Sequence, residues 1–193
     1  MELNKTFWET KYAQQDTGWD TGGITEPLKT YVDSLENKNQ SILIPGAGNS
    51  YEAEYLYQNG FKNVDVIDLA SQPLINLKTR EPNFPEENLI QGDFFELNKT
   101  YDLILEQTFF CALDPVLRPA YAKKMSELLN PQGKLAGVLF DFALSENGPP
   151  FGGSREEYLH YFEPYFTIKK LEKCYNSIKP RMGNELFIIF EKP

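Results

Sequence analysis

The chain has 193 residues, and its hydrophobic content of 41% and aromatic content of 14% are typical of a globular domain with a sizeable core. Its 19 basic and 28 acidic side chains give a net charge of −9, which argues against a nucleic-acid partner because phosphates require a basic surface. No apolar run approaches the ~18 residues of a membrane span, and the first residues lack the apolar core of a signal peptide. We therefore expect a cytoplasmic protein with no membrane partner, in which Cys111 and Cys174 are buried and reduced.

The first 36 residues are expected to form two helices separated by a glycine-rich loop. The loop, Trp19-Asp20-Thr21-Gly22-Gly23, is too rich in glycine for a regular element. The second helix is expected to start near Glu26-Pro27, because proline suits the first helical turn, and to end around residue 37. Three aromatic side chains flank the loop: Trp8, Tyr12 and Trp19. They could simply pack on the sheet, but their number favours a lid, residues 1–36, over a ligand site.

The stretch 41–52 reads as a short apolar strand, a Gly-x-Gly turn at Gly46 and Gly48, and the start of a helix. Glycine permits positive φ and lets a ligand lie directly against the backbone. A strand, a tight glycine turn and a helix N-terminus form the crevice where α/β sheets bind nucleotide-like cofactors. The helix is expected to end at Asn59-Gly60, a regular C-terminal signal.

Two further strands each end in a carboxylate. Asp68 closes the strand 63–68 and lies 20 residues beyond Gly48, the spacing at which an acidic residue accepts hydrogen bonds from ribose hydroxyls. The alternative role for Asp68 is to cap the helix expected over 72–79. Asp93 follows the short strand 88–91 and is followed by Phe94. A carboxylate beside an aromatic ring suits adenine, which needs a hydrogen-bond acceptor for its amino group and an apolar face.

The rest of the chain continues the alternation of strands and helices. We expect these elements: a strand over 101–106 extended by 107–111, a helix over 116–129, a strand over 134–142, a helix over 154–163, and a final antiparallel hairpin of strands 165–175 and 184–192 that turns across 180–183. The alternation predicts an α/β parallel sheet. Because we find no repeat, low-complexity segment or linker, we expect one domain over residues 1–193, and because no exposed apolar heptad is visible we expect a monomer.

The glycine turn narrows the choice of cofactor. A dinucleotide site needs a third glycine so that the helix can pack closely under a pyrophosphate, but Tyr51 stands at that position. No Gly-Lys-Ser/Thr of a phosphate loop follows either. A cofactor with ribose and adenine but no phosphate fits better, which indicates S-adenosylmethionine. An NAD-dependent oxidoreductase and a catalytically silent cofactor-binding protein are the alternatives.

The chain resembles the thiopurine S-methyltransferase family of S-adenosylmethionine-dependent enzymes, and more closely its halide/thiol methyltransferase branch. The resemblance covers residues 7–190 and rests on these motifs: Phe7-Trp8, Gly18-Trp19-Asp20, Ile44-Pro45-Gly46-Ala47-Gly48, Asp68, Gly92-Asp93-Phe94-Phe95, Tyr101-Asp102-Leu103-Ile104, Thr108-Phe109-Phe110-Cys111-Ala112, Arg118-Pro119-Ala120-Tyr121-Ala122 and Gly148-Pro149-Pro150-Phe151. It implies a Rossmann-like class I methyltransferase fold, with a seven-stranded, mostly parallel sheet, an antiparallel last strand and helices on both faces.

The resemblance also implies the cofactor contacts. It places the rings of Trp8, Tyr12 and Trp19 over the cofactor, with Tyr12 standing where that branch often has tryptophan. It places the backbone of Gly46 and Gly48 against the methionine part, Asp68 on the ribose, and Asp93 with Phe94 at the adenine. Gln107 is expected to line the same pocket at a position where relatives carry tyrosine, which puts any role for a phenol there in doubt.

On the acceptor side, the resemblance points to Arg118 as the residue nearest the substrate. A fixed cation would favour a thiolate or another anion, because a nearby positive charge lowers the pKa of an acid. The alternative is a surface salt bridge to Asp114 or Glu106. The single histidine, His160, is expected to be structural, and no metal is expected. The Gly148–Phe151 turn is expected to close the pocket. The acceptor is a small nucleophile, for which the resemblance favours sulfur.

Overall fold

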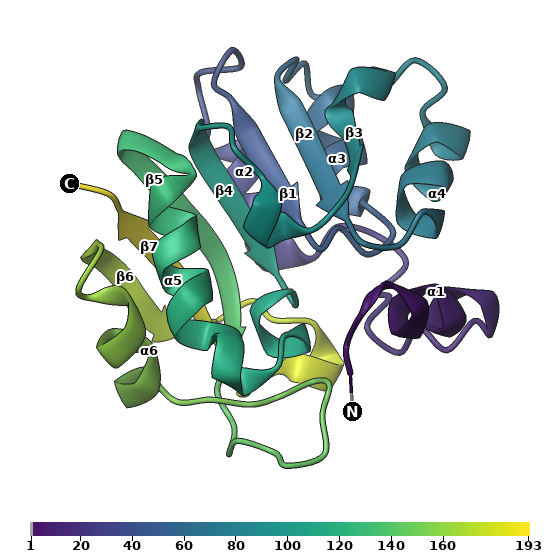
Figure 1. Cartoon of the computed structure of the whole chain (residues 1–193). Coiled ribbons are helices and arrows are strands. Elements are labelled where there is room, and N and C mark those ends of the chain that lie inside the picture. Colours follow the sequence, from purple (N-terminus) through teal and green to yellow (C-terminus); the bar gives the residue numbers. More distant parts are fainter. Residues whose placement is uncertain (1) are drawn as a thin grey trace.

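The computed structural model describes residues 2–193 and contains one seven-stranded sheet (Figure 1). The strands are β1 (Ile42–Pro45), β2 (Val64–Asp68), β3 (Leu89–Gln91), β4 (Tyr101–Gln107), β5 (Leu129–Phe140), β6 (Thr167–Lys173) and β7 (Glu185–Glu191). Their order across the sheet is β3-β2-β1-β4-β5-β7-β6. From β1 the chain first adds strands on one side (β2, β3) and then on the other (β4, β5). At such a reversal α/β sheets open a crevice for ligands.

The first five strands run parallel, and β7 runs antiparallel to both β5 and β6. In the pairing of β5 with β7, Phe140 at the end of one strand lies opposite Glu185 at the start of the other. The chain segment that enters β7 therefore reaches the same edge of the sheet as the carboxyl ends of β1, β4 and β5. The predicted class of fold, including the reversed last strands, is confirmed.

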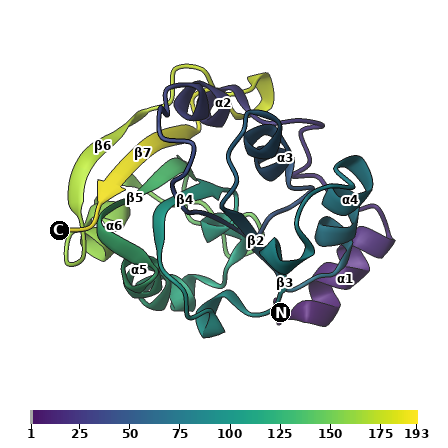
Figure 2. The same ribbon diagram turned by 90° about the horizontal axis from the view of Figure 1, so that it is seen from above.

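Helices cover both faces of the sheet (Figures 1 and 2). They are α1 (Lys5–Ala13), α2 (Glu26–Asp33), α3 (Tyr51–Gln58), α4 (Gln72–Arg80), α5 (Arg118–Glu127) and α6 (Arg155–Phe162). Side chains of α2, α3 and α4 pack in one apolar cluster with Ile42 and Ile44, whereas those of α5 and α6 pack in a second cluster with Leu43. Alternate residues of β1 thus face opposite layers, as the period of a strand requires.

The first helix is the exception to this layering. Figure 1 shows α1 beside the edge where the parallel strands end, apart from both layers. No side chain of α1 is fully buried. The helix therefore covers the ligand edge of the sheet without adding to either core.

Three predicted boundaries are wrong. Helix α2 ends at Asp33, not near residue 37, and the Ser34 hydroxyl donates to the Tyr31 carbonyl at its end (2.6 Å). Strand β4 ends at Gln107 because Thr108 has a φ of 60°, in the left-handed region, so the chain turns into a short 3₁₀ segment. Strand β5 begins at Leu129, which pairs with Tyr101, five residues earlier than expected.

Within residues 2–193, no helix has the length and hydropathy needed to cross a membrane. Both cysteines, Cys111 and Cys174, are buried and free, as predicted.

Candidate functional site

A cavity of about 640 Å³ lies at the carboxyl edge of the parallel strands. Its walls come from α1 and the loop behind it, from the segments that follow β1 to β5, and from the approach to β7. The Gly148-Pro149-Pro150 segment contributes to the wall, which confirms that this turn borders the pocket. Segments far apart in the sequence therefore meet around one hollow.

The three N-terminal aromatic side chains form a cluster that faces this cavity. Trp19 meets Trp8 edge-on at 5.7 Å between ring centroids, and Tyr12 at 5.6 Å. All three side chains line the cavity. Burial, and secondly the charge of Asp68, raises the pKa of Tyr12 well above its usual range, so its phenol stays protonated. The arrangement brings the predicted lid residues together over the site.

The glycine turn after β1 forms the floor of the cavity. Gly46 and Gly48 have φ of 59° and 54°, in the region that glycine alone enters without cost. A Cβ at Gly46 would overlap the Phe109 ring, and one at Gly48 would lie 3.7 Å from the Trp19 ring. The Phe109 ring thus already occupies the side-chain position at Gly46, whereas a Cβ at Gly48 would be in ordinary contact with Trp19.

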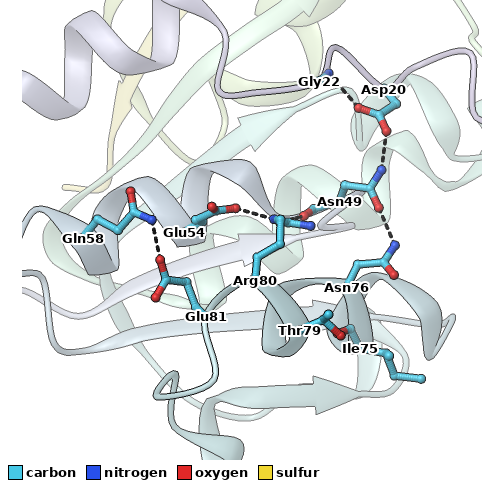
Figure 3. Close-up of polar contacts among 10 residues, drawn as sticks. All are labelled: Asp20, Gly22, Asn49, Glu54, Gln58, Ile75, Asn76, Thr79, Arg80 and Glu81. Atoms are coloured by element: carbon cyan, nitrogen blue, oxygen red, sulfur yellow. Dashed lines mark hydrogen bonds and ion pairs between the residues drawn. The ribbon is translucent and has the colours of Figure 1, made fainter.

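Polar contacts fix the segment after the turn to the lid loop and to α4 (Figure 3). The Asn49 side chain donates to the Asp20 carboxylate and accepts from Asn76 Nδ2 at 2.6 Å. Asp20 also accepts from the Gly22 backbone N–H at 2.8 Å. Arg80 donates to the Asn49 carbonyl and to Glu54 Oε2 at 2.5 Å. The glycine turn and the lid loop are thereby held in a fixed relation.

Asp68 reaches the cavity from the end of β2. Its Oδ1 accepts the Ala70 backbone N–H at 2.8 Å, but Ser71 is the N-cap residue of α4, so the alternative role of Asp68 as a helix cap is wrong. Burial raises the pKa of Asp68 to about 6, against the opposing effect of backbone N–H groups at Ala70, Ala47 and Gly48. The carboxylate is thus ionised near neutral pH and lies beside the glycine turn.

Asp93 and Phe94 lie further along the same wall. Asp93 is exposed and accepts the Phe95 backbone N–H at 2.8 Å. Phe94 is buried, with its ring centroid 5.2 Å from that of Phe109. An exposed acceptor and an apolar ring therefore stand together, as the pairing in the sequence predicts.

Gln107 does not line the large cavity, contrary to its predicted place. It borders a second, smaller hollow of about 40 Å³, which shares Gly46, Gly48 and Trp19 with the large one. Its Oε1 accepts from the Thr25 hydroxyl at 2.8 Å, while its Nε2 is buried without a hydrogen-bond partner. Gln107 therefore offers an unused amide donor beside the glycine turn.

The expectation that Arg118 lies nearest the substrate is wrong, because its side chain does not line the cavity. Its side chain is fully buried and is absent from the cavity wall. Nη1 donates to Glu157 Oε1 at 2.7 Å and Nη2 to the Gly152 carbonyl at 2.7 Å, and the guanidinium carbon lies 4.7 Å from the Phe110 ring centroid. The expected salt-bridge partners, Asp114 and Glu106, are also wrong. Arg118 begins α5 on the face that packs against α6, so it ties these helices to the pocket loop.

Two titratable groups near the end of β4 are structural. Glu106 is fully buried and accepts from the backbone N–H groups of Phe109 (2.8 Å) and Phe110 (3.0 Å) and from the Tyr121 hydroxyl. Burial raises the pKa of Glu106 to about 7. Burial likewise raises the pKa of the Cys111 thiol far above its usual range, so this cavity-lining thiol stays protonated and is no nucleophile.

Sequence reasoning missed Arg181, which lines both cavities. The sequence places it in a hairpin turn, where a basic residue normally lies in solvent. The available signal was the direction of the last strand, because a residue that precedes a reversed strand reaches the ligand edge of the sheet. Within residues 2–193, no group of three His, Cys, Asp or Glu side chains is placed to hold a metal ion.

Comparison with known proteins agrees with this geometry. Residues 3–192 match the family described as Thiopurine S-methyltransferase (TPMT). The chain is 31% identical over 185 residues to the probable thiol methyltransferase 2 of Arabidopsis thaliana, covering 92% of this chain and 81% of the relative. It is 28% identical over 183 residues to thiocyanate methyltransferase 1 of Brassica oleracea, with the same two coverages.

A solved structure shares the fold. It is the 1,6-didemethyltoxoflavin-N1-methyltransferase of Burkholderia thailandensis with bound 1,6-didemethyltoxoflavin and S-adenosylhomocysteine. The TM-score is 0.77 at 17% identity, over 97% of this chain and 86% of that one. At this identity the likeness is evidence for the fold alone.

Proposed function

We propose, because the chain belongs to the thiopurine S-methyltransferase family, that its cavity brings S-adenosylmethionine together with a small sulfur nucleophile. The chain is an S-adenosylmethionine-dependent methyltransferase of the kind that acts on soft nucleophiles. The observation that carries the proposal is that an aromatic lid, a bare glycine turn and the Asp68 carboxylate surround one cavity. We further propose that the methyl acceptor is a thiol or bisulfide, with a halide as the second candidate.

The residues present fit this cofactor. Gly46 and Gly48 border the cavity without side chains of their own, and the Phe109 ring packs against Gly46. The buried Nε2 of Gln107, which borders the small hollow with these glycines, lacks a partner. Asp68 would accept the ribose hydroxyls, and Asp93 with Phe94 would hold the adenine. The rings of Trp8, Tyr12 and Trp19 would cover the cofactor. Such a cluster of edge-on rings offers a ligand both apolar ring faces and polar N–H or O–H groups.

A dinucleotide fits less well. Tyr51 occupies the position of the third glycine, and the Arg80 guanidinium carbon lies 4.7 Å from its ring centroid. Arg80 in turn is held by Glu54 and Asn49. The third glycine, which lets helix and strand pack closely at a pyrophosphate site, is therefore absent.

The protein's task in the reaction is alignment and exclusion of water. When bound, S-adenosylmethionine supplies a methyl group attached to a cationic sulfur. The acceptor's electron pair forms the new bond to the methyl carbon, the bond from carbon to the cofactor's sulfur breaks, and that sulfur becomes a neutral sulfide. Apolar side chains form part of the cavity wall: Phe109, Phe140, Pro149 and Pro150. They strip water from an incoming thiolate, which is a stronger nucleophile when less hydrated, and they hold it in line. Good alignment can contribute about 7–11 kcal/mol to lowering a barrier.

The test combines binding and turnover. Calorimetry should detect binding of S-adenosylmethionine and S-adenosylhomocysteine but no binding of NAD. Headspace analysis should detect more methanethiol from bisulfide than methyl iodide from iodide. Binding of NAD alone would refute the cofactor assignment. Cofactor binding without transfer to any thiol, selenol or halide would favour the silent alternative.

A further inference from the structure

The geometry points to Arg181 as the residue that binds the negative charge of the acceptor inside the cavity. This assignment rests on the proposed function and names the group that would recognise an anionic sulfur. Arg181 lies on the 3₁₀ turn Lys179–Arg181, just before β7, and borders both hollows of the site.

The order of the strands places Arg181 at the acceptor end. Along the ligand edge, Asp68 ends β2, and the glycine turn follows β1. On the other side of the turn, Thr108 follows β4, Phe140 ends β5 and Arg181 precedes β7. Asp68 and Asp93 therefore come from one side of the glycine turn, and Arg181 comes from the other side and borders the small hollow beside the turn. A cofactor that spans from Asp93 to the glycine turn would leave Arg181 for the second substrate.

Arg181 retains hydrogen-bonding capacity. Its Nη2 donates to the Trp19 carbonyl at 2.9 Å, which fixes the guanidinium against the lid loop. Its Nη1 forms an ion pair with Oε1 of Glu185 at 3.6 Å, but it is buried and has no hydrogen-bond partner. A buried, unpaired N–H of a charged group is costly, which argues that a ligand completes its hydrogen bonds.

The other cations near the site differ from Arg181 in exposure or in place. Lys5 and Lys11 also line the cavity, but Lys5 is exposed and lies 3.8 Å from Glu9, and Lys11 donates to Asp16 at 2.6 Å. The buried Nε of Arg118 also lacks a hydrogen-bond partner, but Arg118 does not line the cavity. Among the cavity-lining cations of the described chain, Arg181 is thus the one with a buried N–H that lacks a hydrogen-bond partner.

The surroundings of Arg181 suit a soft anion. Its guanidinium carbon lies 5.7 Å from the Phe140 ring centroid, and the apolar wall continues through Pro149 and Pro150. Burial raises the pKa of Glu185, whereas the neighbouring charge of Arg181 lowers it. A guanidinium in an apolar wall lowers the pKa of an adjacent thiol, and so favours thiolate over thiol at neutral pH.

The experiment measures binding of thiocyanate, a soft anion, to protein saturated with S-adenosylhomocysteine, so that no turnover occurs. We compare wild type, Arg181→Gln, Arg181→Lys and the control Lys179→Gln, which removes an exposed cation from the same turn. We expect Arg181→Gln to weaken thiocyanate binding by about 10- to 100-fold, the range for a lost hydrogen bond to a charged group. The thiocyanate affinity of Arg181→Lys should lie between those of wild type and Arg181→Gln, and that of Lys179→Gln should equal the wild-type affinity.

The affinity for S-adenosylhomocysteine should change less than about threefold in every variant. Equal thiocyanate binding in wild type and Arg181→Gln would overturn the assignment. A loss of S-adenosylhomocysteine binding with thiocyanate binding retained would also overturn it, since Arg181 would then serve the cofactor's carboxylate. Thiocyanate binding that depends on Arg181, in a protein that methylates no sulfur acceptor, would support this assignment while refuting the proposed function. Circular dichroism and melting curves verify that each variant is folded.

Discussion

Asp68 carries its carboxylate into the cavity with a pKa raised to about 6 by burial. Only the ionised form accepts hydrogen bonds from both ribose hydroxyls, so protonation must oppose cofactor binding. The affinity should therefore be constant above pH 7 and fall as the pH drops through about 6. At pH 5, one unit below that pKa, we expect S-adenosylhomocysteine to bind about 10-fold more weakly than at pH 8.

Calorimetry between pH 5 and pH 8 checks this prediction. Asp68→Asn serves as the control: it should bind weakly at pH 8 and lose most of the pH dependence. A wild-type affinity that stays flat across this range would show that Asp68 does not bind the cofactor as an anion.

Arg118 is predicted to act through structure rather than through contact with substrate. Replacing it by methionine leaves Glu157 without its cation and the Gly152 carbonyl without its donor. Removal of one partner from a buried ion pair typically costs about 3–5 kcal/mol in the free energy of unfolding. Urea denaturation of Arg118→Met should show a loss of this size.

Lys123→Met is the matched control, because Lys123 lies on the same helix in an exposed pair with Glu127. It should change the stability by about 0.5 kcal/mol or less. If Arg118→Met kept its stability but lost turnover of bisulfide, the original expectation of an anion-binding Arg118 would stand instead.

The sequence identified most side chains around the cavity but misplaced the two arginines. Asp68 and the glycine turn follow a strand directly, so their position depends only on local geometry and strand spacing. The direction of Arg118 depends on how α5 packs against α6, and that of Arg181 on the pairing of β7 with β5. The packing of α5 against α6 leaves no local pattern in the sequence, whereas the predicted reversal of the last strand was the available signal for Arg181.

At the scale of elements, α1 is the segment most suited to move. It has no fully buried side chain, and its aromatic contacts to Trp19 are edge-on pairs of about 0.5–1.5 kcal/mol each beyond their buried area. A segment with few buried contacts opens locally at low free energy. We predict that hydrogen exchange in residues 5–13 is fast in the free protein and slows on addition of S-adenosylhomocysteine.

Strands β4 and β5 provide the internal reference, because their exchange should be slow in both states. In Trp19→Ala the slowing of α1 should be largely lost, since Trp19 joins Trp8 and Tyr12. Equal protection of α1 with and without the ligand would mean that the helix is a fixed wall and not a lid.

Two of the three element boundaries that sequence reasoning misjudged share one cause. Polar turn residues such as those before Lys134 read as a loop, yet Gln132 donates its backbone N–H to the Lys192 carbonyl at 2.9 Å and stays in the sheet. Conversely, the apolar run after Gln107 reads as strand, yet Glu106 accepts two backbone N–H groups and folds it into a turn. Tertiary hydrogen bonds override local preference in both places.

At the scale of the whole molecule, the reversal of β7 explains how the site is assembled. A fully parallel sheet would place the residues before its last strand at the opposite edge, far from the cavity. Here the pairing of β5 with β7 brings Arg181 to the Trp19 carbonyl, 162 positions away in the sequence. The alternation of strands and helices made this class of fold predictable, whereas the contact between the two ends of the site was not.

The central claim is that the cavity transfers a methyl group to sulfur. The most direct measurement incubates the protein with bisulfide and S-adenosylmethionine carrying a trideuterated methyl group, and follows labelled methanethiol in the headspace together with S-adenosylhomocysteine in solution. We predict that the two products appear in a 1:1 ratio and that neither forms without protein. S-adenosylhomocysteine formed without labelled methanethiol, or no product at all under saturating cofactor, would contradict methyl transfer to sulfur.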